Sequence, residues 1–148
     1  MDAVSTLNGL LDRLTLGQHP EWFRRWVGPV QEQWTSPAHE IVVEAGYPYP
    51  SYQTNGQDLT FGSLSLANAA ELLAQISTQS LAHEFPRPPD PALVNEIAQS
   101  LAVLGGDAKF ATNREGSTWY PLSKATFDVG LVGFNGSWGF AICFEEED

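Results

Sequence analysis

The chain has 148 residues, of which 43% are hydrophobic, and its 18 acidic residues against seven Lys and Arg residues give a formal net charge of -11. This length suits one domain, residues 1–148, and the apolar share is sufficient for a packed core. Nucleic acid and anionic lipid repel so acidic a protein, which argues against both as direct partners. The charge is consistent either with plain solubility or with complementarity to a basic partner protein.

Cysteine usage and the first residues bear on the compartment. Cys143 is the only cysteine, so no disulfide can form within the chain, as is typical of the reducing cytoplasm. The N-terminal residues lack the basic and apolar regions of a signal peptide, and no apolar run approaches the ~20 residues of a membrane span. We therefore expect a soluble cytoplasmic protein without membrane contact.

The first third of the chain contains two patterns of helical spacing and one β-branched run. Apolar residues at helical spacing predict a helix over residues 3–14. Aromatic and aliphatic residues recur similarly over residues 22–34, which predicts a second helix that Pro29 kinks or splits. Ile41-Val42-Val43 predicts a strand within residues 39–45.

A tyrosine-rich segment follows this predicted strand. Tyr47, Tyr49 and Tyr52 alternate with Pro48 and Pro50, and proline cannot donate to a sheet ladder. The segment therefore predicts a stiff, extended loop. Because tyrosine offers a large contact area with few torsions to freeze, the three tyrosines are candidate partner contacts. Rings folded back over the edge of the core are an equally open interpretation.

The middle of the chain contains two helices with clear N-terminal signals. Ser65 is a candidate N-cap for a helix from Leu66 to about Ser80. Asp90-Pro91 combines an N-cap with a first-turn proline, and Gly105-Gly106 would end that helix. Shorter apolar segments predict strands at residues 59–61, 109–111 and 118–120.

The C-terminal segment has the strongest local pattern. Two apolar runs, residues 131–134 and 137–144, flank Asn135-Gly136, and this dipeptide tolerates the positive φ angles of a type I′ turn, so it predicts a β-hairpin. The acids that follow either keep an edge strand from pairing or dock a basic partner. Because helices come mostly first and strands gather late, we expect an α+β domain: an antiparallel sheet that includes this hairpin, packed with about four helices.

No residue pattern predicts catalysis or metal binding. Cys143 and the histidines His19, His39 and His83 lack the spacing of a metal site. The chain has no nucleophile elbow, P-loop or dinucleotide fingerprint. His39 and His83 are each followed by a glutamate, and His39 with Glu40 is the better candidate pair for a small hydrolase. We therefore expect neither an enzyme nor a bound metal or cofactor.

The stretch from Asn113 to Asp128, with Ala125-Thr-Phe-Asp128 leading into the hairpin and the acidic end, resembles the C-terminal part of small bacterial immunity proteins. The resemblance spans about the last third of the chain. It implies an acidic cytoplasmic protein that neutralises one cognate toxin by covering its active site or by blocking its folding. The expected partner contacts are the tyrosines and acids Tyr47, Tyr49, Tyr52, Glu145, Glu146 and Glu147. The alternative is a non-enzymatic structural or adaptor module that self-associates through its aromatic surface, which the exposed edge expected of a terminal hairpin favours.

Overall fold

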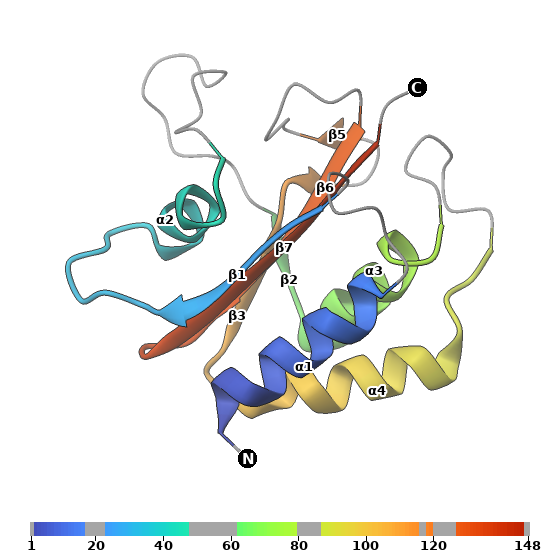
Figure 1. The fold of residues 1–148 in the computed structure, drawn as a ribbon, viewed down its shortest axis with the longest axis horizontal. Helices are drawn as coiled ribbons and strands as arrows, with labels where there is room; N and C mark the ends of the chain where they lie inside the picture. Colours follow the sequence, from blue (N-terminus) through green and yellow to red (C-terminus); the bar gives the residue numbers. More distant parts are fainter. Residues whose placement is uncertain are drawn as a thin grey trace.

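The computed structural model describes residues 2–16, 23–47, 62–79, 87–115, 118–119 and 127–146. In these residues a five-stranded antiparallel sheet lies between two layers of helices (Figure 1). Helices α1 (Ala3–Thr15), α3 (Leu66–Ile76) and α4 (Pro91–Leu101) cover one face, and α2 (Pro37–Glu44) covers the other. The predicted α+β class is confirmed.

The sheet has the strand order β1-β7-β6-β3-β2. Its strands, in chain order, are β1 (Phe23–Pro29), β2 (Gly62–Leu64), β3 (Lys109–Thr112), β6 (Phe127–Phe134) and β7 (Trp138–Glu146). Two short strands, β4 (Arg114–Glu115) and β5 (Thr118–Trp119), pair separately. The predicted hairpin is therefore present as β6 and β7, but it lies inside the sheet. The expectation of an exposed hairpin edge is wrong, because β1 pairs with β7 over seven residues.

Side-chain caps fix the starts of three helices. Asp2 Oδ1 accepts a hydrogen bond from Ser5 N at 2.7 Å and begins α1. Ser65 and Asp90 do the same for α3 and α4. Each cap satisfies a backbone N–H that has no partner within the helix. After α4, a 3-10 turn at Ala102–Leu104 ends at Gly105, whose φ of 90° favours glycine. Of the four predicted helices, the three that begin at residues 3, 66 and 91 are confirmed.

Two predicted elements are wrong in type. Residues 23–29, which fall in the helix predicted over residues 22–34, form strand β1. Residues of this strand pack into the cores on both faces of the sheet, so its apolar residues do not show the simple alternation that identifies a strand. The strand predicted within residues 39–45 is also wrong, because residues 37–44 form helix α2. Pro37 occupies the first helical turn, and packing of Ile41 and Val42 against the sheet overrides the β preference of these two residues.

The hairpin turn also differs from the predicted type I′ turn. Asn135 precedes the turn instead of occupying its centre: its N–H donates to Trp138 O at 2.9 Å. Its side-chain Oδ1 accepts from both Ser137 N and Trp138 N at 2.7 Å. Gly136 does not adopt a positive φ. The asparagine side chain therefore shapes this turn by bonding the backbone, as in an Asx turn.

Each face of the sheet has its own core. Leu131 of β6 points toward α1, α3 and α4, whereas its neighbour Val132 points toward α2. A Cβ added to Gly133 would lie 2.4 Å from Phe140 Cε1 and 2.9 Å from Phe110 Cδ1. Gly133 therefore lies where the sheet packs too closely on these rings to admit a side chain. The register of β6 and β7 continues without a bulge from Phe127 to Phe134.

Candidate functional site

A polar cluster lies on the α2 face, where β1 and β7 run side by side. Arg24 of β1 is opposite Cys143 of β7, and Tyr47 follows α2. The Arg24 side chain donates from Nη1 to Gly46 O at 2.6 Å and lies 4.6 Å from the centre of the Tyr47 ring. Its Nε is 3.6 Å from Glu145 Oε1. Arg24 therefore fastens the segment after α2 to the sheet through a hydrogen bond, a cation–π contact and an ion pair.

Burial decides the protonation of this cluster. Burial raises the pKa of the Tyr47 hydroxyl well above its usual range, and the neighbouring acidic groups Cys143 and Glu145 add to the effect. Burial also raises the pKa of the Cys143 thiol, to about 12. Cys143 is fully buried. A thiol that is both neutral and enclosed is a poor nucleophile, so Cys143 serves as a small core residue.

A hydrogen-bond network on the same end of the sheet joins β6 to the end of β3. Asn113 Nδ2 donates to Asp128 Oδ1, and Asn113 Oδ1 accepts from Gly130 N, both at 2.8 Å. Thr112 Oγ1 donates to Gly130 O at 2.7 Å. All three side chains are buried. Because each bond satisfies a group that has lost water, this network holds the two strands in register.

The structure places the predicted partner contacts in very different settings. Tyr47 is only 2% exposed and lies under Arg24. Glu145 and Glu146 belong to β7, opposite Asp128 and Phe127 of β6, and are not a free tail. Tyr49, Tyr52 and Glu147 lie outside the described residues. Tyr47 and Glu145 thus support the fold in this structure, and a role for any of the six in partner binding stays a prediction.

A cavity opens at the opposite end of β7, beside the hairpin turn. Its volume is about 310 Å³. It lies between the loop after β1, the first turn of α2 and the start of β3. Its walls combine apolar and charged side chains, chiefly Val30, Trp34, Phe134, Glu32, Asp107 and Lys109. Trp34 and Phe134 are half-buried, whereas the three charged side chains are exposed at its rim.

Several contacts hold the walls of this cavity in place. The rings of Trp34 and Trp26 pack at 6.4 Å between centres, tilted by 48°. Val30 N donates to Ser137 O at 2.9 Å. Asn135 Nδ2 donates to Leu104 O at 2.9 Å, which ties the hairpin turn to the 3-10 turn after α4. The cavity is therefore built on fixed backbone, as ligand sites usually are.

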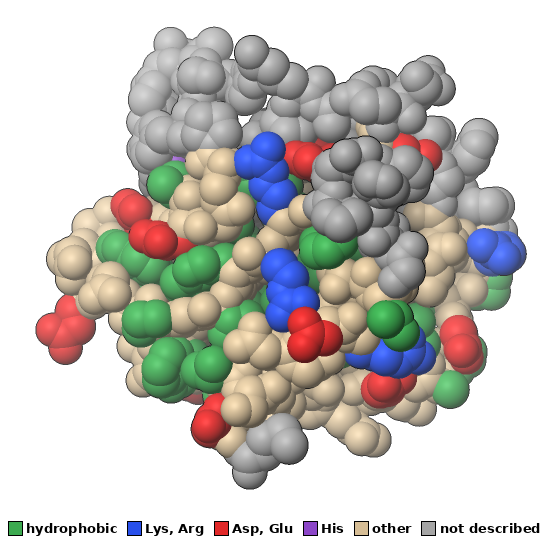
Figure 2. Space-filling model, viewed as in Figure 1, with side chains coloured by type: hydrophobic (Ala, Val, Ile, Leu, Met, Phe, Trp, Pro, Cys, Tyr) green, Lys and Arg blue, Asp and Glu red, His purple; other side chains and the backbone are tan. Residues whose placement is uncertain are grey.

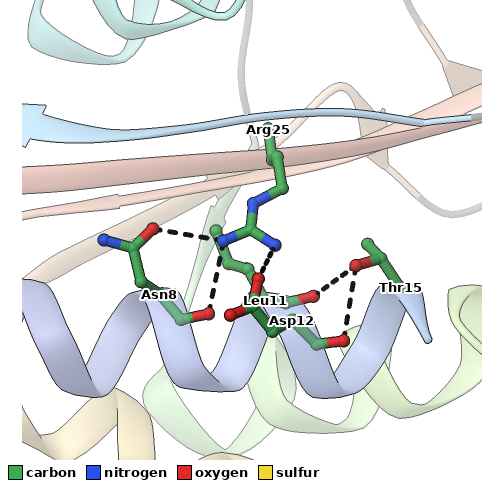
Figure 3. Close-up of polar contacts among 5 residues, drawn as sticks. All are labelled: Asn8, Leu11, Asp12, Thr15 and Arg25. Atoms are coloured by element: carbon green, nitrogen blue, oxygen red, sulfur yellow. Dashed lines mark hydrogen bonds and ion pairs between the residues drawn. The ribbon is translucent and has the colours of Figure 1, made fainter. Parts of the chain in front are cut away.

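Internal contacts occupy most of the described arginines. Arg25 donates to Asp12 Oδ1 at 2.5 Å and to Asn8 O and Oδ1 at 3.3 and 3.1 Å (Figure 3). On the same helix, Thr15 Oγ1 donates to Leu11 O. Arg13 pairs with Glu96, and Arg24 with Glu145. These pairs cancel part of the positive charge locally, so the unbalanced acids dominate the outer surface.

One face of the molecule combines such acids with apolar side chains. Figure 2 shows acidic side chains over α2 and the loop after β1, and hydrophobic side chains over the end of β1 and the hairpin turn. We call this surface the acidic aromatic face and define it by Trp34, Glu32, Glu40 and Glu44. Trp138 is 38% exposed, but it precedes Gly139, which faces Ile41 of α2, so Trp138 points to the other face of the sheet. Within the described residues, none of these glutamates forms an ion pair.

Sequence reasoning did not identify this face. Trp34 falls in a pattern that suggests a buried helix, and Glu32 and Glu44 fall in two different predicted elements. The available signal was the cluster of tryptophans Trp22, Trp26 and Trp34 on both sides of Pro29, because aromatic residues are enriched at binding surfaces. His39 is buried in α2 and does not line the cavity, and the hydrolase alternative stays a prediction.

Comparisons with known proteins give no match: no protein-family model, no curated protein and no solved structure matches the chain. None of the helices in the described residues is both long and apolar enough to span a membrane. The same residues contain no group of three or more His, Cys, Asp or Glu side chains that could hold a metal ion. The functional argument therefore depends on the surface itself.

Proposed function

We propose that this chain binds and neutralises a basic protein, in the manner of an immunity protein toward its cognate toxin. The acidic aromatic face would make the contact. The single observation that carries the proposal is the combination, on this face, of the partly exposed Trp34 side chain with glutamates that have no cationic partner in the described residues. The net charge of -11 adds a negative electrostatic potential around the molecule as a whole, which also attracts a basic partner.

This combination has a direct physical meaning for binding. Tryptophan side chains supply much of the affinity of protein interfaces when they enter a desolvated pocket. Acidic groups around them steer a basic partner and raise the association rate. A toxin that acts on nucleic acid presents a basic cleft to the phosphates, so an acidic face would compete there for the same positive charges.

Co-expression tests the proposal. The chain is produced with the protein encoded immediately upstream, and cell survival and co-purification are scored. Survival that requires this chain, together with a stable complex, is the expected result. Survival that does not depend on the chain, or no complex, would overturn the immunity role.

Charge variants then test the surface. Glu40→Gln with Glu44→Gln should lower the association rate about tenfold at low salt and weaken its dependence on ionic strength. Glu71→Gln is the matched control, because Glu71 is exposed on α3, which packs on the opposite face of the sheet. Equal effects of the two changes would place the contact elsewhere.

Self-association as an adaptor module is the second candidate function. It is favoured by β1, which is a seven-residue strand at the edge of the described sheet. Pairing of two β1 strands would join two sheets, although Arg24, Arg25 and Pro29 make this edge a poor template. Light scattering decides: a defined dimer supports this function, and a strict monomer at high concentration excludes it.

A further inference from the structure

The cavity beside the hairpin turn lies next to the acidic aromatic face, since Trp34 and Glu32 belong to both. Its volume of about 310 Å³ is at the lower limit of small-molecule sites. It is therefore suited to one side chain or one small group. From its walls we propose that the cavity takes the guanidinium group of an arginine side chain. The inference rests on the proposed function in one respect, namely that a basic partner protein supplies the arginine.

The aromatic walls favour this occupant over other groups. Trp34 and Phe134 both line the cavity. A guanidinium is planar, weakly hydrated and able to stack on aromatic rings, whereas an ammonium group is a strongly hydrated point charge. Val30 adds an apolar wall for the aliphatic part of the arginine side chain.

The charges at the rim point the same way. Glu32 and Asp107 contribute two carboxylates and Lys109 one ammonium group, so the lining carries a net negative charge. Carboxylates accept the forked N–H groups of arginine in a bidentate geometry. Lys109 opposes a cation, but its exposed side chain at the start of β3 is free to extend into solvent. Glu40 in the first turn of α2 offsets the positive end of that helix.

A titration with N-acetylarginine amide tests the site in the full-length protein. The probe should shift the Trp34 indole N–H resonance in a saturable manner, with a dissociation constant in the ~1–10 mM range expected for one side chain. N-acetylcitrulline amide has nearly the same shape without the charge and should bind about fivefold more weakly or not at all. The indole resonance is assigned with Trp34→Phe.

Three substitutions sharpen the test. Asp107→Asn and Glu32→Gln should each weaken binding of the arginine probe about threefold, and Lys109→Gln should strengthen it about threefold. Glu71→Gln should leave it unchanged. All four positions are exposed, so we expect the variants to fold, and unchanged amide spectra elsewhere in the protein would verify this.

The outcomes separate the cavity from the proposed function. If the arginine probe gives no saturable shift, or citrulline binds equally well, the inference is overturned even where a complex with a basic partner forms. If N-acetylglutamate amide binds and Lys109→Gln abolishes that binding, the cavity is an anion site and the inference is again overturned. If arginine binds as expected but co-expression gives no complex, the cavity assignment stands and the immunity role fails.

Discussion

The two faces of the sheet are covered in different ways. Toward α1, α3 and α4, the buried hydrophobic residues form one large continuous cluster. Toward α2, a smaller apolar cluster shares the surface with Arg24, Tyr47 and Asp128 at one end and with the cavity at the other. The comparison indicates a division of roles: the larger core supplies most of the stability, whereas the α2 face exchanges part of its packing for charge and for a binding site.

Truncation of two neighbouring residues in β6 tests this division most strongly. Leu131 and Val132 are both almost fully buried but point to opposite faces. Leu131→Ala should lower the free energy of unfolding by about 2–5 kcal/mol, because it removes three carbons from the larger core and leaves a cavity. Val132→Ala should cost about 2 kcal/mol. Chemical denaturation measures both, and a larger loss for Val132→Ala would contradict the proposed division.

Addition of a methyl group provides the complementary comparison. Gly133→Ala would force a Cβ to within 2.4 Å of the Phe140 ring in the larger core, and should cost about 2–3 kcal/mol. Gly139→Ala meets the terminal carbon of Ile41 at 2.7 Å on the α2 face, and should cost less because that methyl group can turn away. Gly136→Ala is the control, since nothing lies within 4 Å and its φ is not positive. Thermal melting would rank the three.

The polar cluster can be tested by comparing two arginines. Arg24→Ala removes the hydrogen bond to Gly46, the contact with Tyr47 and the partner of Glu145, whose side chain is only 13% exposed. We expect a loss of about 2 kcal/mol. Arg13→Ala breaks an ion pair whose side chains are 56% and 50% exposed, and should cost less than about 0.5 kcal/mol. Equal losses would show that the α2 face gains nothing from its buried charge.

The sequence predicted the elements whose local signals agree with the tertiary structure. Asp90 and Pro91 start α4, and Ser65 starts α3, because caps act within a few residues of the helix end. The hairpin follows from two apolar runs around Asn135. The prediction failed at β1 and α2, where packing on both sides of the sheet decides the conformation and the local pattern is ambiguous.

The polar cluster around Arg24 and the cavity beside the hairpin turn could not be predicted from the sequence, because both depend on contacts between distant segments. Arg24 and Glu145 are separated by 121 positions in the sequence and form an ion pair only because β1 pairs with β7. Trp34 and Phe134 form one cavity because the loop after β1 reaches the hairpin turn. The order of strands in the sheet determines both the Arg24–Glu145 contact and the cavity. A single sequence predicts this order poorly, because any two antiparallel strands could be neighbours.

The smallest effect we expect is an alkaline loss of stability that arises on the α2 face. Burial raises the pKa of the Cys143 thiol from 9.0 to about 12. The folded state therefore keeps this proton between these values, while the unfolded state releases it. Stability is fully present below pH 9 and falls as the pH rises, by up to about 1.4 kcal/mol per pH unit for one proton.

Denaturation at pH 8, 9 and 10 isolates the thiol from the tyrosine. The pKa of Tyr47 is raised from 10.0, also by burial, so its contribution begins mainly above this window. The loss between pH 8 and pH 10 should be smaller in Cys143→Ala by about 1 kcal/mol, and nearly unchanged in Tyr47→Phe. If the Cys143→Ala protein loses as much stability as the original chain, the thiol is not held neutral by burial. Water would then reach the polar end of the α2 face. The two faces of the sheet would differ in how well they exclude water more than in how tightly they pack.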